Sequence, residues 1–214
     1  MSRIRNAVSA RRGGQRAVRR VILLAGLLGS LGALAASGVP AYASNSTQAP
    51  GFEHVVYLTG SGHAEEFYYP LGETGPHWKM TDVTSQVAGA ASAAPGSALT
   101  SWADSGFEHV VYLTGSGHAE EFYYPLGETG PHWKMTDVTS QVAGAASAAP
   151  GSALTSWADS SYEHVVYLTG SGHAEEFYYP LGQTGPHWKM TDVTSQVAGA
   201  ASAAPGSALT SWAR

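Results

Sequence analysis

The chain has 214 residues, enough for one domain of ordinary size, with 16 acidic residues against 11 basic ones and no cysteine. Seven of the basic residues are arginines within the first 20 positions, so the remainder of the chain is strongly acidic. A body this acidic cannot neutralise phosphate groups, which excludes nucleic acid as an expected partner. Without disulfides, an exported chain must be stabilised by its core or by assembly.

The first 43 residues have the three parts of a secretory signal peptide. A basic segment, residues 1–20, precedes an apolar run at 21–36, and a small-residue stretch ends in the Ala-x-Ala site at 41–43. We therefore expect cleavage after Ala43 and a secreted, extracellular protein. The apolar run is shorter than the roughly 20 residues that span a bilayer, and an uncleaved membrane anchor is the alternative. The pair Arg19-Arg20 leaves export by the twin-arginine route open beside general secretion.

Cleavage would make the mature chain more acidic still. Four basic residues would remain, Lys79, Lys134, Lys189 and Arg214, against all sixteen acidic residues, for a net charge near −12. Anionic lipid surfaces repel such a chain, so we expect no membrane insertion once the signal is removed.

A short polar leader, residues 44–50, is followed by three copies of one sequence. Residues 51–105 and 106–160 are identical at all 55 positions. The third copy, residues 161–214, differs at Ser161, Tyr162 and Gln183 and ends in Arg214 where the others have Asp. A fixed period of this length indicates stacked supersecondary units, one for each repeat.

Each repeat contains four candidate strands. In the first copy, the strands and their connections are 55–59, the turn Gly60-Ser61-Gly62, 64–69 ending before Pro70, a loop at 71–76, 78–84, a connector or helical turn at 86–96, and 97–102. The hairpin of the first two strands is apolar on both faces, with Val56 and Leu58 on one side and Val55 and Tyr57 on the other. Two apolar faces predict a sheet packed between neighbouring sheets.

Short strands in repeated units that pack face to face predict an all-β fold, a β-propeller of four-stranded blades with three blades in the chain. An open β-solenoid is the alternative. The first hairpin lacks a leading strand, and the last strand of the chain, 207–212, is the one that it lacks. Three blades are fewer than the four to eight of closed propellers, so we expect a homodimer that closes a six-bladed ring.

The blade sequence resembles a known family. GSALTSW followed by HVVYL, a G-S-G turn and HAEEFYY is similar to the blade repeat of the six-bladed fucose-binding lectins and to secreted actinobacterial β-propeller repeats. The resemblance covers all three repeats. In those lectins, an Arg and a Glu twelve residues later bind the sugar hydroxyls and a Trp or Tyr stacks on the sugar ring.

The resemblance implies one sugar site in each repeat. The Glu position falls on Glu66, Glu121 and Glu176, and the Arg position falls on His54, His109 and His164. The stacking Trp is either Trp78, with copies Trp133 and Trp188, or Trp102, with copies Trp157 and Trp212. His in place of Arg is a departure, because His has at most two donors and is mostly neutral at pH 7. A Trp repeated in every blade has a structural alternative, core packing between blades.

The turn decides whether His54 and Glu66 can share a ligand. If Gly60-Ser61-Gly62 is a three-residue loop with Gly62 left-handed, the residue numbers of each strand pair add up to 122, and His54, Val56, Glu66 and Tyr68 lie on one face. A two-residue loop would place His54 and Glu66 on opposite faces.

Other patterns give weaker predictions. Glu65 and Glu66 point to opposite faces of one strand, so they are not a catalytic pair within a blade. His63 and Glu65 share a face and could bind a metal, but no pair has the spacing of an established zinc site. We expect His63 and His77 to be partly exposed structural residues and Asp82 to accept hydrogen bonds at a turn.

Taken together, these features predict a secreted, multivalent carbohydrate-binding propeller of lectin type, without catalysis and without cofactor or metal. The expected partners are glycans, with fucosylated glycans as the class that the resemblance implies, and a second copy of the chain. A structural or protein-interaction propeller whose sugar site has decayed is the alternative from another class. A propeller glycosidase is the third.

Overall fold

The structure is a computed structural model that describes residues 51–72, 74–75, 78–128 and 130–212. The chain divides into two units, Met1–Asn45 and Ser46–Arg214, and the described residues all belong to the second. The predicted signal peptide therefore lies outside the described residues, as does His77. None of the helices in the described ranges is long and apolar enough to cross a membrane.

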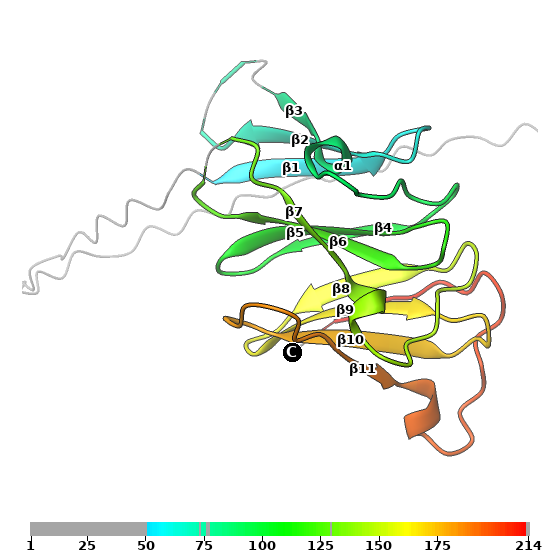
Figure 1. Ribbon diagram of the computed structural model, residues 1–214. Coiled ribbons are helices and arrows are strands. Elements are labelled where there is room, and N and C mark those ends of the chain that lie inside the picture. The colour runs from blue at the N-terminus through cyan, green and yellow to red at the C-terminus, as the bar shows by residue number, and fades with distance from the viewer. Residues whose placement is uncertain (1–50, 73, 76–77, 129, 213–214) are drawn as a thin grey trace, which may run out of the picture. The chain divides into compact units, whose positions relative to one another are not determined.

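The described residues form three antiparallel sheets (Figure 1), which confirms the prediction of an all-β chain. The first sheet has the order β1-β2-β3, the second β4-β5-β6-β7 and the third β8-β9-β10-β11. The strands are β1 (Phe52–Leu58), β2 (Ala64–Pro70), β3 (Lys79–Asp82), β4 (Leu99–Ala103), β5 (Phe107–Leu113), β6 (Ala119–Pro125), β7 (Lys134–Asp137), β8 (Leu154–Ala158), β9 (Tyr162–Leu168), β10 (Ala174–Pro180) and β11 (Lys189–Asp192). The helical turns α1 (Val83–Gln86), α2 (Val138–Gln141) and η1 (Thr194–Gln196) follow β3, β7 and β11.

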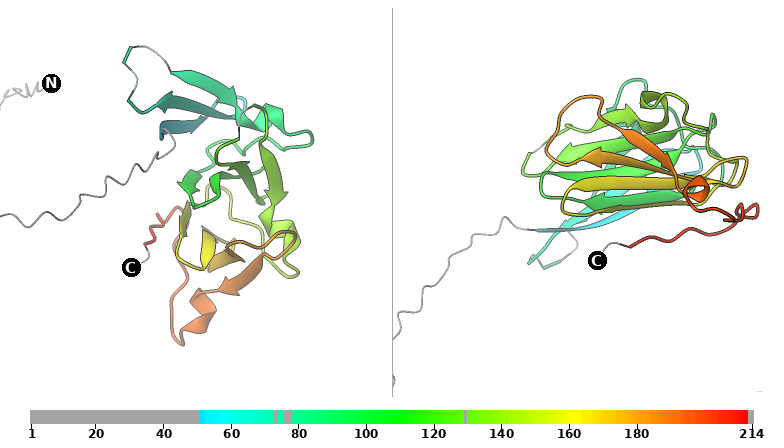
Figure 2. Two further views of the ribbon diagram at one scale, coloured as in Figure 1. Left: turned by 90° about the vertical axis from the view of Figure 1, so that its left-hand side faces the viewer. Right: turned by 90° about the horizontal axis from the view of Figure 1, so that it is seen from below.

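Each complete sheet begins with a strand from the preceding repeat. β4, at the end of the first repeat, pairs with β5, and β8 pairs with β9 in the same way. The first sheet has only three strands, as the missing leading strand predicts. The last described segment, 207–212, lies beside the third sheet (Figure 2): Ser211 Oγ is 2.7 Å from Thr155 Oγ1. The equivalent atoms one repeat earlier, Ser156 Oγ and Thr100 Oγ1, are 2.6 Å apart. The segment 207–212 therefore lies beside β8 in the way that β8 lies beside β4.

The register of the first hairpin confirms the three-residue turn. Leu58 pairs with Ala64 and His54 with Tyr68, so the residue numbers of each pair add up to 122. Gly62 has φ 79°, in the left-handed region that this turn requires. The Thr59 carbonyl accepts a hydrogen bond from the Gly62 amide at 3.0 Å. His54 and Glu66 therefore lie on one face.

The third strand is shorter than the sequence predicts, and the helical turn comes earlier. The predicted strand 78–84 ends at Asp82 because this residue caps the turn α1: its Oδ1 accepts from the Ser85 amide at 2.9 Å. Its Oδ2 lies 2.9 Å from Nδ1 of His63 at the hairpin. The expected role of Asp82 as a hydrogen-bond acceptor at a turn is confirmed.

The sheets pack face to face, and the second sheet is buried on both faces. Val110, Tyr112 and Phe122 pack against Ala64 of the first sheet and Val83 of the helical turn α1. The opposite face packs against the third sheet through Val111, Leu113, Val165, Tyr167 and Phe177. This arrangement confirms the prediction from two apolar hairpin faces.

The connectors after the helical turns cross the hairpin turns closely, and this contact makes a glycine necessary. Gly117 has φ 76°, and a Cβ placed there would lie 2.7 Å from the Ala148 carbonyl oxygen. We expect Gly117→Ala to lower the free energy of unfolding by about 2 kcal/mol or more, from left-handed strain and the backbone clash. Denaturant unfolding measures this.

The matched control is Gly115→Ala in the same turn, where a Cβ would meet nothing within 4 Å and the backbone is not left-handed. We expect a change below about 1 kcal/mol for it. Equal losses in the two variants would contradict this role of the connector.

Candidate functional site at the sheet junctions

A Glu-His dipeptide lies near the start of the strands β1, β5 and β9, and its two side chains point to two different junctions between sheets. Successive strand residues point to opposite faces. Glu108 therefore points back to the first sheet, where its Oε2 lies 3.4 Å from Nδ1 of His54. His109 points forward, and its Nδ1 lies 3.4 Å from Oε2 of Glu163 in the third sheet. Each junction thus joins a His of one sheet to a Glu of the next.

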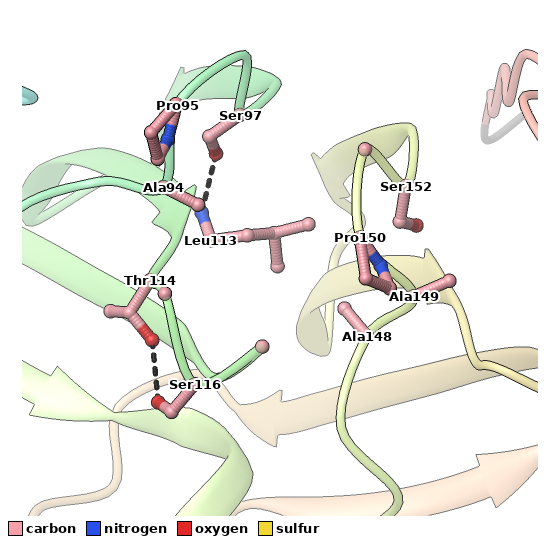
Figure 3. A pocket seen from close by; sticks show the side chains of 13 residues that line it. Ala94, Pro95, Ser97, Leu113, Thr114, Ser116, Ala148, Ala149, Pro150 and Ser152 are labelled. Carbon is pink, nitrogen blue, oxygen red and sulfur yellow. Dashed lines mark hydrogen bonds between the residues drawn. The ribbon is translucent and has the colours of Figure 1, made fainter.

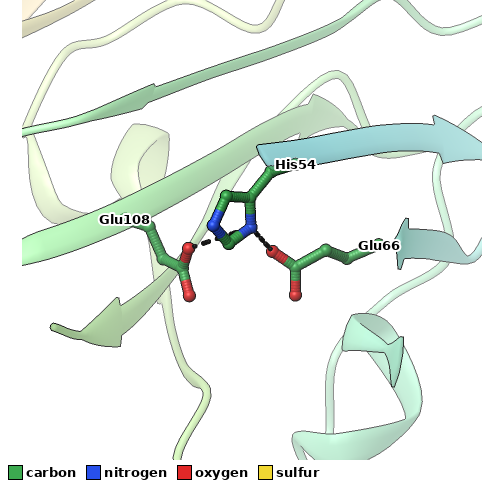
Figure 4. Close-up of side chains that lie close together, drawn as sticks. All are labelled: His54, Glu66 and Glu108. Atoms are coloured by element: carbon green, nitrogen blue, oxygen red, sulfur yellow. Dashed lines mark hydrogen bonds and ion pairs between the residues drawn. The ribbon is translucent and has the colours of Figure 1, made fainter. Parts of the chain in front are cut away.

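At the first junction, His54 on β1 lies between two carboxylates (Figure 4). Its Nδ1 is 2.7 Å from Oε1 of Glu66 on β2, and Glu108 approaches from β5. Because a carboxylate oxygen only accepts, the Nδ1–H of His54 donates to Glu66. Glu66 is buried, whereas the His54 side chain is one-third exposed. The first junction is therefore open to solvent on the His54 side.

At the second junction the same groups are covered. The His109 Nδ1 lies 2.8 Å from Oε1 of Glu121, and both residues are less than 5% exposed. The indole of Trp102 stacks on the His109 ring with centroids 4.5 Å apart and an interplanar angle of 1°. Asp104, in the turn before β5, places Oδ2 3.7 Å from His109 Nε2. Four polar residues and one aromatic ring therefore enclose the second junction.

The third sheet repeats this arrangement except for the Glu from a following sheet. His164 Nδ1 lies 2.9 Å from Glu176, and its Nε2 lies 3.3 Å from Oδ2 of Asp159. Trp157 stacks on His164 with centroids 4.5 Å apart. In the described residues no further sheet follows, so no Glu approaches His164 from beyond.

Burial and like charge raise the pKa of the carboxyl groups that cross the junctions. Loss of solvent, and then the charge of Glu66, raise the pKa of Glu108 to about 7. Loss of solvent, followed by the charges of Glu121 and Asp104, raises the pKa of Glu163 to about 9. The hydrogen bond to Glu66 raises the pKa of His54. Both junctions thus favour the protonated form of the carboxyl group that crosses them.

The two candidate tryptophan positions have different surroundings. Trp133 and Trp188 are 7% exposed and pack in the cores between sheets, whereas Trp78, which has no preceding sheet in the described chain, is exposed. Trp102 and Trp157 stack on the paired histidines. Trp212, their copy in the last segment, is 71% exposed. The structure therefore brings the second tryptophan position, and not the first, to the His–Glu pairs.

An exposed aromatic ring that the sequence did not single out borders each pair. Phe52, Phe107 and Tyr162 open the strands β1, β5 and β9 and are all at least 36% exposed. Phe52 meets the rings of His54 and Tyr68 edge-on, both at 6.0 Å, and the other copies repeat these contacts. A flat apolar surface therefore lies next to each His–Glu pair.

The residues missed by the sequence are those that reach the pair from another turn or sheet. Asp104 is held by its own turn, where its Oδ1 accepts from the amides of Gly106 and Phe107 at 2.6 and 2.7 Å. The alternation of the Glu-His dipeptide, combined with packing of the sheets in chain order, was the signal for Glu108 and Glu163. No comparable signal marks Asp104, because many turns begin with Asp.

Glu65 and its copies lie on the other face, as predicted. Glu120 accepts from the Ala91 amide of the preceding repeat at 3.1 Å, and Glu175 accepts from Ala146 at the same distance. Glu65 accepts from the Tyr57 hydroxyl at 3.0 Å. Glu120 and Glu175 therefore hold the connectors, and all three carboxylates lie on the face opposite to Glu66 and its copies.

A pocket of about 310 Å³ lies at the opposite ends of the strands (Figure 3). It is lined by small residues that include Ala94, Pro95, Leu113, Pro150 and Ser152. Its hydroxyl groups already have partners: Ser97 accepts from the Leu113 amide at 2.9 Å, and Thr114 bonds Ser116 at 2.8 Å. It contains no charged or aromatic side chain, so the junctions are the better candidates for a polar ligand.

Comparison with known proteins gives matches to structures only. No protein-family model and no curated protein matches the chain. AofleA from Arthrobotrys oligospora is 16% identical with a TM-score of 0.48, over 65% of this chain and 38% of that one. A triple arginine-to-alanine mutant of AofleA is 15% identical with a TM-score of 0.47 over the same shares. SapL1 lectin in complex with alpha methyl fucoside is 16% identical with a TM-score of 0.46, over 66% of this chain and 42% of that one. The chain spans about two fifths of the length of these solved chains.

Proposed function

We propose that this chain is a carbohydrate-binding protein that uses one site in each repeat. The observation that carries the proposal is the threefold recurrence of a His–Glu pair beside an exposed aromatic ring. Sugar sites combine a flat apolar surface for C–H groups with a few fixed hydrogen-bonding groups. At the first junction Phe52 supplies the surface, and His54 and Glu66 supply the fixed polar groups.

The roles at such a site follow from the chemistry of each group. Glu66 accepts from sugar hydroxyls and the free nitrogen of His54 donates or accepts, whereas Glu121, which is 3% exposed, would reach a sugar only after movement of the residues that cover it. Phe52, Phe107 and Tyr162 lie under the sugar ring, and the stacked tryptophans Trp102 and Trp157 hold the imidazoles in place. Each site would bind weakly, and several sites presented to one glycan surface gain avidity. Nothing in this arrangement requires catalysis.

We further propose that the three sheets are blades of a β-propeller, closed into a six-bladed ring by a second copy. The two free faces of the chain support this assembly, because they are the two halves of an interface that the chain already forms twice. Val55 on the first sheet is 49% exposed, whereas its copy Val110 is 2% exposed. Val193 beyond the third sheet is 41% exposed, whereas its copy Val138 is fully buried. Head-to-tail contact of these faces closes a ring where the rotation permits.

The incomplete sites also support a second copy. Trp102 and Trp157 each stack on the His of the following strand, and His54 has no such tryptophan among the described residues. In a closed ring, the partner subunit's Trp212 would stack on His54, and the partner's Glu53 would approach His164. The ring would then have six junctions, each with a His–Glu pair, a stacked Trp and a Glu from the following sheet.

Assembly predicts a dimeric mass in solution. One mature chain of about 171 residues would have a mass of about 18 kDa, scaled from 22.2 kDa for all 214 residues. We expect light scattering to give twice this mass. The double variant Val55→Asp and Tyr57→Asp should be monomeric, because it places charge on the apolar face of the first sheet. The control is Leu126→Asp, at an exposed leucine outside the first sheet, and it should remain dimeric. A wild-type monomer would contradict ring closure.

Sugar binding is tested by removing the exposed rings. We expect the triple variant Phe52→Ala, Phe107→Ala and Tyr162→Ala to lose retention on immobilised glycoprotein glycans, with binding weakened at least about tenfold, a change of 1.4 kcal/mol. These side chains are exposed, so the variant should keep the circular dichroism spectrum of the wild type. Leu126→Ala is the control and should bind as the wild type does. Unchanged retention of the triple variant would contradict the assignment of these rings.

A protein-interaction scaffold is the second candidate, and burial of the second junction favours it. His109 and Glu121 are too deeply covered to contact a ligand without movement. Substitution of Glu66, Glu121 and Glu176 together by Gln separates the two candidates. Loss of glycan retention supports sugar binding, while unchanged retention of a protein partner supports the scaffold. Secretion into the extracellular space, as the signal peptide predicts, would suit either function.

A further inference from the structure

The second junction contains a cluster of one imidazole and three carboxylates that exceeds what the interface requires. The second-junction cluster consists of Asp104, His109, Glu121 and Glu163. A carboxylate oxygen of Asp104, a ring nitrogen of His109 and a carboxylate oxygen of Glu163 all lie within 4.8 Å of one another. His109 is 4% and Glu163 5% exposed. Three carboxyl groups therefore surround one buried imidazole ring.

Hydrogen bonding in the cluster leaves acceptors without donors. Glu121 takes the Nδ1–H of His109 at 2.8 Å, so in the neutral ring Nε2 carries a lone pair. Among the described residues, His109 Nε2 and Glu163 Oε2 are buried atoms without a hydrogen-bond partner. Nε2 faces Oδ2 of Asp104 at 3.7 Å, which is another acceptor. Buried acceptors that face one another are unfavourable unless a cation or a proton lies between them.

The ligand positions are held in place from outside the cluster. Asp104 uses Oδ1 to accept from two backbone amides, which leaves Oδ2 directed at His109. Trp102 stacks flat on the imidazole and fixes the plane of the ring. Glu121 fixes the tautomer, which is the role that a carboxylate plays behind a metal-binding histidine. Asp104 and His109 are therefore held in place before any ion binds, whereas Oε2 of Glu163 lies 3.4 Å from Nδ1 and would turn toward Nε2 to complete the site.

We propose that Asp104, His109 and Glu163 bind a divalent transition-metal ion of the zinc class, with His109 Nε2 and one oxygen from each carboxylate as ligands and Glu121 as the outer hydrogen-bond partner. Zinc accepts one imidazole nitrogen and carboxylate oxygens at about 2.0–2.2 Å, and tetrahedral ligands at that range lie about 3.4 Å apart. The 3.7 Å between Nε2 and Oδ2 is close to this spacing. Calcium prefers six to eight oxygen ligands, which three side chains do not supply.

The other repeats contain incomplete versions of the site within one chain. His164 has Asp159 and Glu176 but no Glu from a following sheet among the described residues. His54 has Glu66 and Glu108, but the residue five positions before it is Ala49 and not Asp. The second junction is therefore the complete site of a single chain. The inference does not rest on sugar binding: zinc would occupy the Nε2 of His109, so at this junction zinc and a sugar exclude one another.

Titration of chelator-treated protein with zinc chloride, measured by calorimetry, tests the proposal. We expect zinc to bind the wild type with micromolar affinity or tighter, and calcium to give no heat. Asp104→Asn keeps an oxygen for the turn amides but removes the charge, and should weaken zinc at least tenfold. Asp137→Asn is the matched control, because Asp137 pairs with His118 at 2.8 Å on the surface without a third ligand among the described residues. It should bind zinc as the wild type does.

A second variant keeps the test decisive if Asp104→Asn fails to fold. Glu163→Gln retains the shape of the side chain, removes the carboxyl group that would bind the ion as a carboxylate, and should also weaken zinc binding at least tenfold. Cobalt(II) in place of zinc should give the visible absorption of a tetrahedral site in the wild type and not in Glu163→Gln. No zinc binding by the wild type, or equal binding by the wild type and Glu163→Gln, would overturn the proposal.

Discussion

Folding stability should fall as the pH rises from about 5 to about 9 in the presence of a chelator. The pKa values of Glu108 and Glu163 are raised to about 7 and about 9, above the ordinary value of 4.5, and that of His54 is also raised. A group whose pKa is higher in the folded state stabilises the protein below its unfolded pKa, and this contribution is lost as the pH rises through the folded value. The three shifts therefore act in the same direction.

We expect the loss across this range to be about 3 kcal/mol, since each pKa unit corresponds to about 1.4 kcal/mol and the neighbouring carboxyl groups share the effect. The Tm should fall by roughly 10 °C, at about 2–4 °C for each kcal/mol in a domain of this size. Circular dichroism melts at pH 5, 7 and 9 measure it. Glu163→Gln should flatten the profile and raise the Tm at pH 9. A Tm that rises with pH, or a profile unchanged by Glu163→Gln, would contradict the burial of an excess negative charge.

Truncation of Phe122 should be the most destabilising single substitution in the core between the first and second sheets. Phe122 is fully buried and packs against Tyr112 at 5.2 Å between ring centroids. We expect Phe122→Ala to cost about 3–5 kcal/mol, from lost burial and the cavity that remains. Urea unfolding measures this as a lower midpoint with an unchanged slope.

Phe107→Ala is the control for this substitution, because Phe107 has the same side chain but is partly exposed at the strand start. We expect it to cost less than about 1 kcal/mol. Similar losses for the two phenylalanines would mean that the second sheet does not pack on the first as the structure has it.

The sequence was sufficient for the hairpin and for the geometry of the His–Glu pair. The glycines of the turn determined the register, and the register brought His54 to Glu66. Alternation of apolar side chains on both faces predicted that the second sheet would be covered on both sides. The predicted end of the third strand was wrong, because Asp82 caps the helical turn α1 and this cap outweighs the strand preference of the residues after it.

The environment of each pair could not be read from the sequence, because the repeats are identical and their surroundings are not. The same EHVVYL segment is largely exposed in β1 and buried in β5, where sheets lie on both sides. Burial of His109, in contrast to His54, is therefore a property of its neighbours and not of its own repeat. Glu108 and Glu163 contact a histidine of the preceding repeat, and only the packing of the sheets in chain order, added to strand alternation, would have predicted this.

Sugar binding by the His–Glu pairs and their bordering rings is decided by a glycan array. The array is probed side by side with the wild-type protein and the triple variant Glu66→Gln, Glu121→Gln and Glu176→Gln. We expect the wild type to bind a defined group of glycans and the triple variant to lose those signals while its circular dichroism spectrum is unchanged. Absence of signal from a folded wild-type protein on every glycan, or the same pattern from both proteins, would contradict sugar binding at these pairs.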